Sequence, residues 1–188
     1  MDTMASHPHT PSTIDARAVH ACDSLDTELT PQDYAALALL AVNNKEPINS
    51  LTKANALTYI AQVGGLHDAD HEIDYSPTVD YFTFNNRTPC PHSTELNDTL
   101  QKLADLNLIT ESQHTNRNSK LSRYEYTITD SGGDLLDHAL HTVIDVSTIR
   151  TLKLVKSLYN SMASPKLCDI TVRDYDFRES GDGFVSGL

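Results

Sequence analysis

Apolar residues recur at helical spacing in five segments of the chain, which predicts a mainly α-helical protein. The first segment opens with Thr30, Pro31 and Asp33, which supply a capping hydroxyl, a proline at the first helical position and a first-turn acid. Tyr34 and further apolar residues then follow at helical spacing. We therefore expect a first helix over 31–43.

Four more helices follow from the same pattern, and a hydroxyl residue that can cap a helix stands before three of them. The expected helices and their signals are 51–63 between Ser50 and Gly64-Gly65, 94–106 after Ser93, 130–144 after Thr129, and 147–162, which Pro165 limits.

Two segments have the residue content of strands. Residues 79–84 are β-branched and aromatic, whereas 123–128 alternate between polar and apolar side chains. A polar stretch separates 123–128 from Leu108-Ile109, which predicts a β-hairpin with a long exposed tip. The acidic segment 66–77 is expected to be a loop.

The order helix, helix, helix, hairpin, helix is that of a winged helix-turn-helix domain, in which a two-stranded wing closes a three-helix bundle. We therefore predict a mainly α protein with a small β-hairpin, of the α+β class, with an additional C-terminal helix. The expected organisation is a disordered tail over 1–29, a winged-helix domain over 30–145, a C-terminal helix over 146–168 and a flexible tail over 169–188.

Two motifs resemble those of known regulators. Leu-Asn-Leu-Ile at 106–109 and Tyr-Thr-Ile-Thr-Asp-Ser-Gly-Gly at 126–133 resemble the wing and its exit in winged-helix regulators of the PadR and MarR kind. This resemblance covers 95–140 and implies a DNA-binding winged helix.

A second resemblance is to the Panacea antitoxin domain, which phage-associated proteins share with the proteolysis adaptor SocA. Leu51-Thr52-Lys53 and Leu57-Thr58-Tyr59-Ile60 resemble one helix of that family. Cys90-Pro91-His92-Ser93 with Leu96 resembles the start of another, with Cys90 at the position of the family's glycine. This resemblance implies the same fold, but a protein-binding role as an antitoxin that masks a toxin or as an adaptor.

The charge balance bears on the choice of partner. The formal net charge is −12, with 26 acidic against 14 basic residues, and aspartate outnumbers glutamate by 19 to 7. This composition resembles that of proteins from salt-in halophiles, so we expect a halophilic archaeal or viral origin. An acidic protein ordinarily binds nucleic acid poorly, but this argument weakens at high salt, where cations can lie between carboxylates and phosphates. The positions of the basic residues along the chain therefore say more about a nucleic-acid partner than their total number does.

The helix expected over 94–106 is one candidate surface for double-stranded DNA, since a winged helix places its third helix in the major groove. Its solvent side carries Asn97, Gln101 and Lys102, and the two amides can pair with a base edge. Three acids on the same helix would repel phosphates. We expect the helix alone to be a poor DNA reader.

The wing is the second candidate surface for DNA. Residues 112–124 contain Arg117, Lys120 and Arg123 and no acid, although acids predominate in the chain. These three side chains would make the wing tip a positively charged finger that clamps phosphates. A solvated loop is the alternative.

Another acid-free stretch, 146–168, carries Arg150, Lys153 and Lys156 beside an apolar stripe. The stripe packs either on the core of the same chain, with the basic side chains facing water, or on a second copy in a homodimer. A homodimer would place two wings one helical turn apart.

Two sets of residues have the types that bind transition metals. The run 67–74 gathers two histidines and four carboxylates, for which a solvated acidic loop is the alternative. His138 and His141 stand three residues apart, but no third ligand is visible. We therefore expect no metal site.

The three cysteines, Cys22, Cys90 and Cys168, are odd in number and lack the paired spacing of zinc sites, so we expect reduced thiols. Cys90-Pro91-His92 has no partner cysteine in the sequence pattern. We interpret it as the approach to a helix that Ser93 caps, and a redox role for Cys90 is left open.

The chain has no long apolar run and no signal-like start, so we expect a cytoplasmic location and no membrane partner. It has no nucleophile elbow, phosphate-binding glycine loop or paired-acid motif, so we expect no enzyme activity, no catalytic residue and no cofactor. The sequence predicts a winged-helix DNA-binding protein, a transcriptional regulator that acts as a homodimer. The alternative is a protein-interaction module such as a Panacea-type antitoxin bound to its toxin.

Overall fold

The computed structural model describes residues 29–66, 81–87, 90–115, 122–140 and 142–180. Over these residues the chain is mainly helical with a small antiparallel β component, as the sequence predicts. The helices are α2 (Pro31–Lys45), α3 (Leu51–Val63), α4 (Thr94–Asp105), α5 (Asp130–Ala139), α6 (Val146–Tyr159) and α7 (Ser164–Glu179). One hairpin pairs β1 (Asn85–Arg87) with β2 (Cys90–His92), and the other pairs β3 (Ile109–Thr115) with β4 (Ser122–Ile128).

Side-chain caps begin four of the helices where the sequence places them. Thr30 Oγ1 accepts from Asp33 N at 3.4 Å and Asp33 Oδ2 accepts from Thr30 N at 2.7 Å, which closes a capping box at the start of α2. The hydroxyls of Ser50, Ser93 and Thr129 accept from backbone N–H groups at the starts of α3, α4 and α5. The predicted starts of these helices are confirmed.

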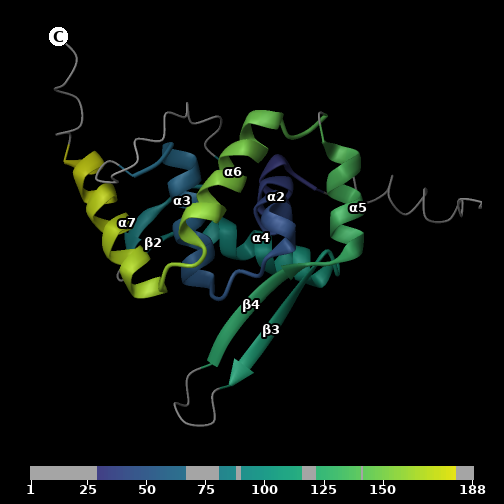
Figure 1. Cartoon of the computed structure of the whole chain (residues 1–188), viewed down its shortest axis with the longest axis horizontal. Coiled ribbons are helices and arrows are strands. Elements are labelled where there is room, and N and C mark those ends of the chain that lie inside the picture. The colour runs from purple at the N-terminus through teal and green to yellow at the C-terminus, as the bar shows by residue number, and fades with distance from the viewer. Residues whose placement is uncertain (1–28, 67–80, 88–89, 116–121, 141, 181–188) are drawn as a thin grey trace, which may run out of the picture.

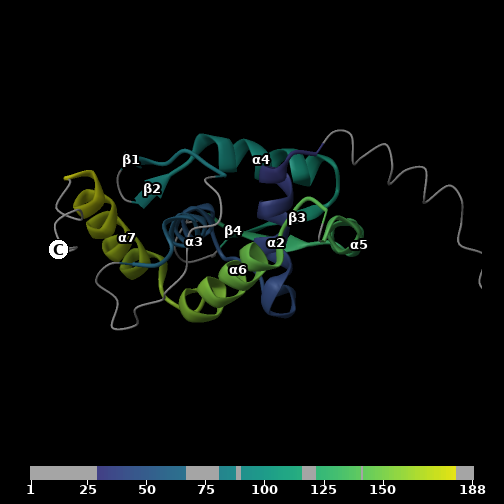
Figure 2. The same cartoon turned by 90° about the horizontal axis from the view of Figure 1, so that it is seen from above.

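Helix α2 forms the centre of the fold together with α3 (Figure 1). Figure 2 shows α4 on one side of this pair and α6 on the other, with α5 and α7 at the two ends of the molecule. Every residue of α2 from Asp33 to Leu40 is buried, so this part of the helix has no solvent face. It contacts α4, α5, α6 and β4 and is a core helix.

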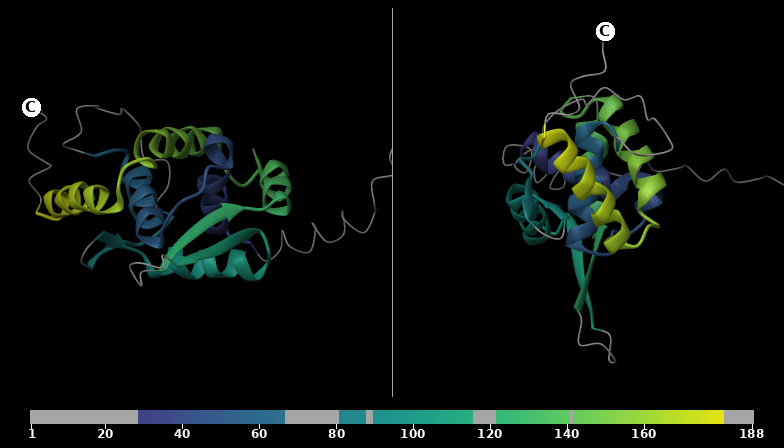
Figure 3. Two further views of the ribbon diagram at one scale, coloured as in Figure 1. Left: turned by 60° about the horizontal axis from the view of Figure 1, so that its bottom comes forward. Right: turned by 90° about the vertical axis from the view of Figure 1, so that its left-hand side faces the viewer.

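The β3–β4 hairpin projects away from the helical body (Figure 1 and the right panel of Figure 3). Its register begins at the body with Ile109 opposite Ile128. Near this base Ile48, between α2 and α3, exchanges two backbone hydrogen bonds with Tyr126, at 3.1 and 3.0 Å. The connection from α2 to α3 thus adds a third strand-like edge to the base of the hairpin.

The strand predicted over 79–84 is wrong for the part of that segment that the structure describes. Gln62 instead pairs with the backbone of Phe82, donating to its carbonyl at 2.6 Å and accepting from its N–H at 3.0 Å. Thr83 N donates to Glu95 Oε2 at 2.8 Å. Because side chains from α3 and α4 satisfy this backbone, the segment needs no strand partner.

The C-terminal part departs most from the prediction. The sequence predicts a flexible tail over 169–188, but α7 runs on to Glu179. Leu167, Thr171 and Asp174 on this helix are buried. The helix packs against α3 and β2, so α7 belongs to the body of the protein and is not a tail.

Two further boundaries differ from the prediction. Helix α5 ends at Ala139, before the predicted end at Ile144. The segment 146–168 is not one helix, because α6 ends at Tyr159 and α7 begins at Ser164. The expected N-terminal tail and the acidic loop lie almost entirely outside the described residues.

Candidate nucleic-acid interface

Asn97, the first amide expected to read a base, is engaged within the protein. Its Oδ1 accepts from Asn55 Nδ2 at 3.1 Å, and its Nδ2 lies 3.1 Å from His92 Nε2. Asn55 is buried and also accepts from Ser93 N at 2.7 Å. This network joins α3, β2 and α4, so Asn97 holds the start of α4. Sequence reasoning missed Asn55, although a polar residue between two alanines in an apolar helix is a visible signal.

The other two residues predicted on α4 differ in exposure. The ammonium of Lys102 donates to Asp33 Oδ2 at 2.8 Å, and that carboxylate is buried. Gln101 is exposed, with its amide donating to Asp105 Oδ1 at 2.9 Å. Of the three residues predicted on α4, Gln101 is therefore the one best placed to meet a ligand.

The outward side of α4 is acidic. Glu95, Asp98 and Asp105 are exposed, and the last two line a shallow hollow of about 360 Å³ together with Gln101 and Lys102. Since Lys102 is already paired with Asp33, it does not offset these acids fully. Carboxylates repel phosphates, so the expectation that α4 alone is a poor DNA reader stays a prediction.

The wing holds the other three predicted DNA contacts. Arg123 lies in β4, in register with His114 on β3. Arg117, Lys120 and the side chain of Arg123 lie outside the described part of the chain, so their role stays a prediction. The described part of the hairpin projects away from the helical body (Figure 1).

Two acids, Glu111 and Glu125, lie in the described part of the hairpin, in the middle of its register. Tyr126 Oη donates to Glu111 Oε1 at 3.4 Å. The pKa of Tyr126 is raised, mainly by burial and to a smaller extent by the negative charge of Glu111. His114 Nε2 lies 3.9 Å from Glu125 Oε1, an ion pair when the imidazole is protonated. These acids make the described part of the hairpin less positive than the basic residues of 112–124 alone would suggest.

The basic residues of α6 divide into two kinds. Arg150 and Lys153 are exposed, whereas Lys156 is fully buried and donates to the carbonyl oxygens of Leu40 at 2.9 Å and Val42 at 3.1 Å. Burial lowers the pKa of Lys156 to about 8. The prediction that this lysine faces water is wrong, because its ammonium satisfies carbonyl groups where α2 loses helical geometry.

The apolar stripe of α6 packs within the chain. Leu152, Val155 and Tyr159 are buried, and α6 contacts α2 and α3. Of the two alternatives that the sequence leaves open, packing on the core of the same chain holds for this stripe. Val146 and Leu154 remain exposed on the same helix, at 41% and 39%.

Cys90 and Cys168 form a disulfide, although they are separated by 78 residues in the sequence. Their Cα atoms lie 4.8 Å apart because α7 packs along β2. The expectation of reduced thiols is wrong for this pair, and spacing along the chain gives no signal for it. The positional interpretation of the segment is confirmed, since β2 leads directly into Ser93 and α4.

Metal ligands are not gathered in the described ranges, where no group of three or more His, Cys, Asp or Glu side chains is placed to hold an ion. His138 is exposed, and its Nδ1 lies 2.7 Å from Asp134 O. His141 and the run 67–74 lie outside those ranges.

No family model, no curated protein and no solved structure matches this chain. The resemblances to winged-helix regulators and to the Panacea domain therefore rest on their motifs alone. Among the described helices, none is long and apolar enough to cross a membrane.

Proposed function

We propose that the chain is a winged-helix DNA-binding protein, a transcriptional regulator of a halophilic archaeon or one of its viruses, with the β3–β4 hairpin as its wing. The observation that carries the proposal is the pair of backbone hydrogen bonds between Ile48 and Tyr126. It fixes the base of a projecting hairpin to the connection between two core helices. A hairpin fixed in this way can press its tip against a nucleic-acid backbone.

In this proposal the wing supplies most of the affinity. Arg117, Lys120 and Arg123 contact phosphates, and Gln101 on α4 contacts a base edge. Asn97 and Lys102 contribute by holding α4 in place, since both are bonded to residues of other elements.

The salt dependence of DNA binding tests this proposal. The variant carries Arg117→Glu, Lys120→Glu and Arg123→Glu, and its affinity for genomic fragments is measured across a potassium chloride series by fluorescence anisotropy. The plot of log affinity against log salt concentration has a negative slope, to which each phosphate contact adds about 0.9 in magnitude. Loss of three contacts should therefore reduce the magnitude of this slope by about 2 to 3.

A matched control reverses three exposed basic residues away from the wing: Arg150, Lys153 and Lys166. This control makes the same change in net charge, so it should change the slope much less than the wing variant. Equal effects of the two triple variants, or no binding by the wild-type chain at any salt concentration, would refute the proposal.

The homodimer belongs to the same proposal. Val146 and Leu154 are partly exposed on α6 among the described residues and offer an apolar contact to a second copy. Changing both to Ser should turn a dimer into a monomer in sedimentation velocity. A wild-type monomer at all concentrations would refute this part.

A second candidate function is favoured by the charge of the described surface. Asp98 and Asp105 on α4, and Asp134 and Asp137 on α5, are exposed acids suited to a basic protein partner. In this case the chain is an interaction module such as an antitoxin or an adaptor. Co-purification of one stoichiometric partner from the native host, without DNA binding, would favour it over the first candidate.

A further inference from the structure

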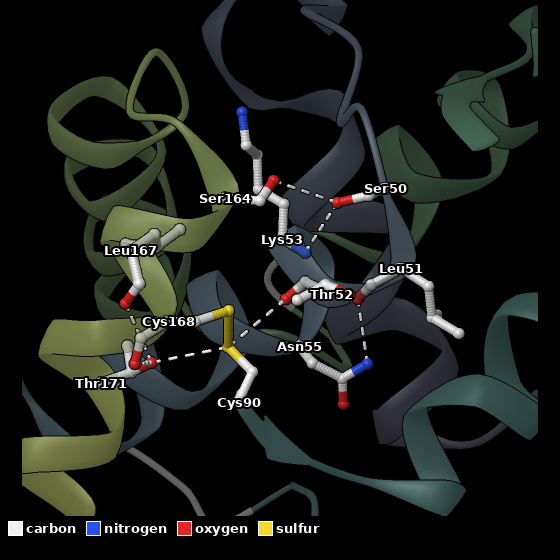
Figure 4. The surroundings of a disulfide bond; sticks show 10 residues. All are labelled: Ser50, Leu51, Thr52, Lys53, Asn55, Cys90, Ser164, Leu167, Cys168 and Thr171. Atoms are coloured by element: carbon white, nitrogen blue, oxygen red, sulfur yellow. Dashed lines mark hydrogen bonds between the residues drawn. A yellow bond between two sulfur atoms is a disulfide. The ribbon is translucent and has the colours of Figure 1, made fainter. Parts of the chain in front are cut away.

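A pocket of about 630 Å³ lies where α3 and α7 both begin. Its lining includes Ser50, Lys53, Ser164, Cys168 and Asp169. Figure 4 shows that Ser50 and Ser164 face each other across this region, with their hydroxyl oxygens 3.4 Å apart. Figure 4 shows the disulfide next to these serines, and Cys168, one of its two cysteines, lines the pocket.

The two sulfur atoms of the disulfide have different surroundings. Cys168 lines the pocket, and Figure 4 shows its Sγ on the side of the two serines. The Sγ of Cys90 faces inward, 3.6 Å from Thr171 Oγ1 and 4.0 Å from the carbonyl oxygen of Thr52. Of the two cysteines, Cys168 lines the pocket, although it is only 3% exposed. A nucleophile that enters from the pocket would therefore meet Cys168 first, with Cys90 behind it as the leaving group.

Two helix ends near the disulfide favour a thiolate, whereas burial of the two cysteines opposes it. Neither α3 nor α7 has an acid in its first turn, so their positive N-terminal ends are not offset there. Lys53 also lines the pocket, but its ammonium donates to Asn160 O at 2.7 Å, and Figure 4 shows its side chain directed away from the disulfide. Positive charge near a sulfur stabilises both the attacking and the departing thiolate. Asp169 at the rim of the pocket acts in the opposite direction.

The fold also has a place for the reduced cysteines. The Thr171 hydroxyl can donate to the carbonyl oxygens of Leu167 and Cys168, at 3.0 and 3.1 Å, and can then accept from the Cys90 thiol. Both cysteines are buried among apolar residues, which is a usual environment for a free thiol. Reduction thus leaves no polar atom at Cys90 without a partner.

We propose that Cys90–Cys168 is a thiol–disulfide exchange site, reduced by a dithiol that enters the pocket and attacks Cys168. The first thiolate of the dithiol bonds to Cys168 Sγ, the bond between the two cysteines breaks, and Cys90 leaves with the electron pair and takes up a proton. The second thiolate then displaces Cys168, which is also protonated. The protein gains two thiols and the dithiol becomes a disulfide.

The site lies beside the start of α4. Cys90 belongs to β2, which leads into Ser93, the N-cap of α4. Reduction removes a covalent tie between β2 and α7, whereas the hydrogen bond from Tyr59 to Asp174 still holds α7 to α3 at 2.8 Å. The expected consequence is faster hydrogen exchange in β2 and in the first turn of α4, with little change at the end of α7.

Glutathione, a monothiol, can identify the attacked sulfur because it forms a mixed disulfide there, which acid quenching traps before a second thiol displaces it. The protein carries Cys22→Ser, is oxidised in air, and is treated with glutathione in native buffer before acid quenching, alkylation and peptide mapping. We expect glutathione on Cys168 and the alkyl group on Cys90, at a rate proportional to glutathione concentration. Glutathione mainly on Cys90, a rate that does not depend on its concentration, or the lack of a Cys90–Cys168 bond in the oxidised protein would each overturn the proposal.

A charge variant tests the route through the pocket. Asp169→Lys at low salt should speed the reaction with glutathione by about two- to fivefold, because a repelling charge at the rim becomes an attracting one. Asp176→Lys is the control, since it makes the same charge change two turns along α7, away from the lining. Equal acceleration by both variants would exclude the pocket as the route. These measurements involve no DNA, so their outcome is independent of the proposed DNA-binding function.

Discussion

Lys102 on α4 and Asp33 on α2 form an ion pair of 2.8 Å in which the carboxylate is buried and the lysine is partly exposed. The same carboxylate accepts from Thr30 N, so it caps α2 and holds α4 against it. Lys102→Met would leave a buried charge without its counter-ion. We expect the free energy of unfolding to fall by about 2 kcal/mol in urea titrations, less than for a fully buried pair because solvent reaches the lysine.

Lys153→Met is the control for this change, since Lys153 is an exposed lysine on α6. It should change the unfolding free energy by less than about 0.5 kcal/mol. Equal effects of the two variants would show that the pair with Asp33 contributes nothing specific.

Two neighbouring glycines in α5 should respond in opposite ways to alanine. A Cβ at Gly132 would lie 2.1 Å from Leu108 O, a backbone atom that cannot move aside. Gly132→Ala should therefore lower the unfolding free energy by about 2 kcal/mol or more. At Gly133 the nearest atom is Lys45 Nζ at 3.5 Å, so Gly133→Ala should raise it by about 0.5 to 1 kcal/mol through helix propensity. Thermal unfolding of both variants would test the close packing of α5 on the start of β3.

Buried Lys156 should make stability depend on alkaline pH. Its pKa falls from 10.5 to about 8 in the folded protein, mainly through burial. Between these two values the unfolded chain binds the proton and the folded chain does not, so stability rises with pH, by about 3 kcal/mol in total. Below pH 8 both states are protonated and this contribution is constant.

Lys156→Met removes this titration, so the comparison isolates it from other lysines and tyrosines. Wild-type stability minus that of the variant should increase between pH 8 and 10.5 in denaturant titrations. Parallel pH profiles for the two proteins would mean that the buried ammonium keeps an ordinary pKa.

Local sequence was enough to predict where helices begin. Thr30, Ser93 and Thr129 act as caps through contacts within a few residues, and such contacts depend little on the rest of the fold. The hairpin after Leu108-Ile109 was predictable for the same reason, because alternation within 123–128 is also a local pattern.

The parts that could not be predicted depend on contacts between distant segments. From the sequence alone, Lys156 is expected to face solvent beside the apolar stripe of its helix. In the structure, the end of α2 lies next to it, and Lys156 donates to carbonyl groups there that lack helical partners. The sequence around Asn97 likewise gives no sign of its hydrogen bond with Asn55 of α3. No periodicity within one segment contains this information, which is why the candidate site was predicted less well than the fold.

The Cys90–Cys168 bond should stabilise the protein by restricting the unfolded chain, by an amount that grows with the logarithm of the length of the loop it closes. For a sequence separation of 78 residues the chain-entropy model gives about 4 kcal/mol. Oxidised wild type should therefore unfold with a free energy about 4 kcal/mol above that of Cys168→Ser, both in a Cys22→Ser background. Adding a strong reductant should remove most of this difference, whereas a difference that persists would be due to packing of the serine.

Gln101 and Asn97 should separate DNA reading from the positioning of α4. Gln101→Ala removes an exposed amide, so stability should change by less than about 0.5 kcal/mol, while affinity for a site enriched from random DNA should fall about tenfold. Asn97→Ala leaves the buried Asn55 amide short of one acceptor, so the free energy of unfolding should fall by about 1 kcal/mol. Its ratio of affinities for the enriched site and for random DNA should change less than that of Gln101→Ala. If Gln101→Ala keeps the wild-type ratio, α4 does not read bases through this residue, and the wing alone must account for binding.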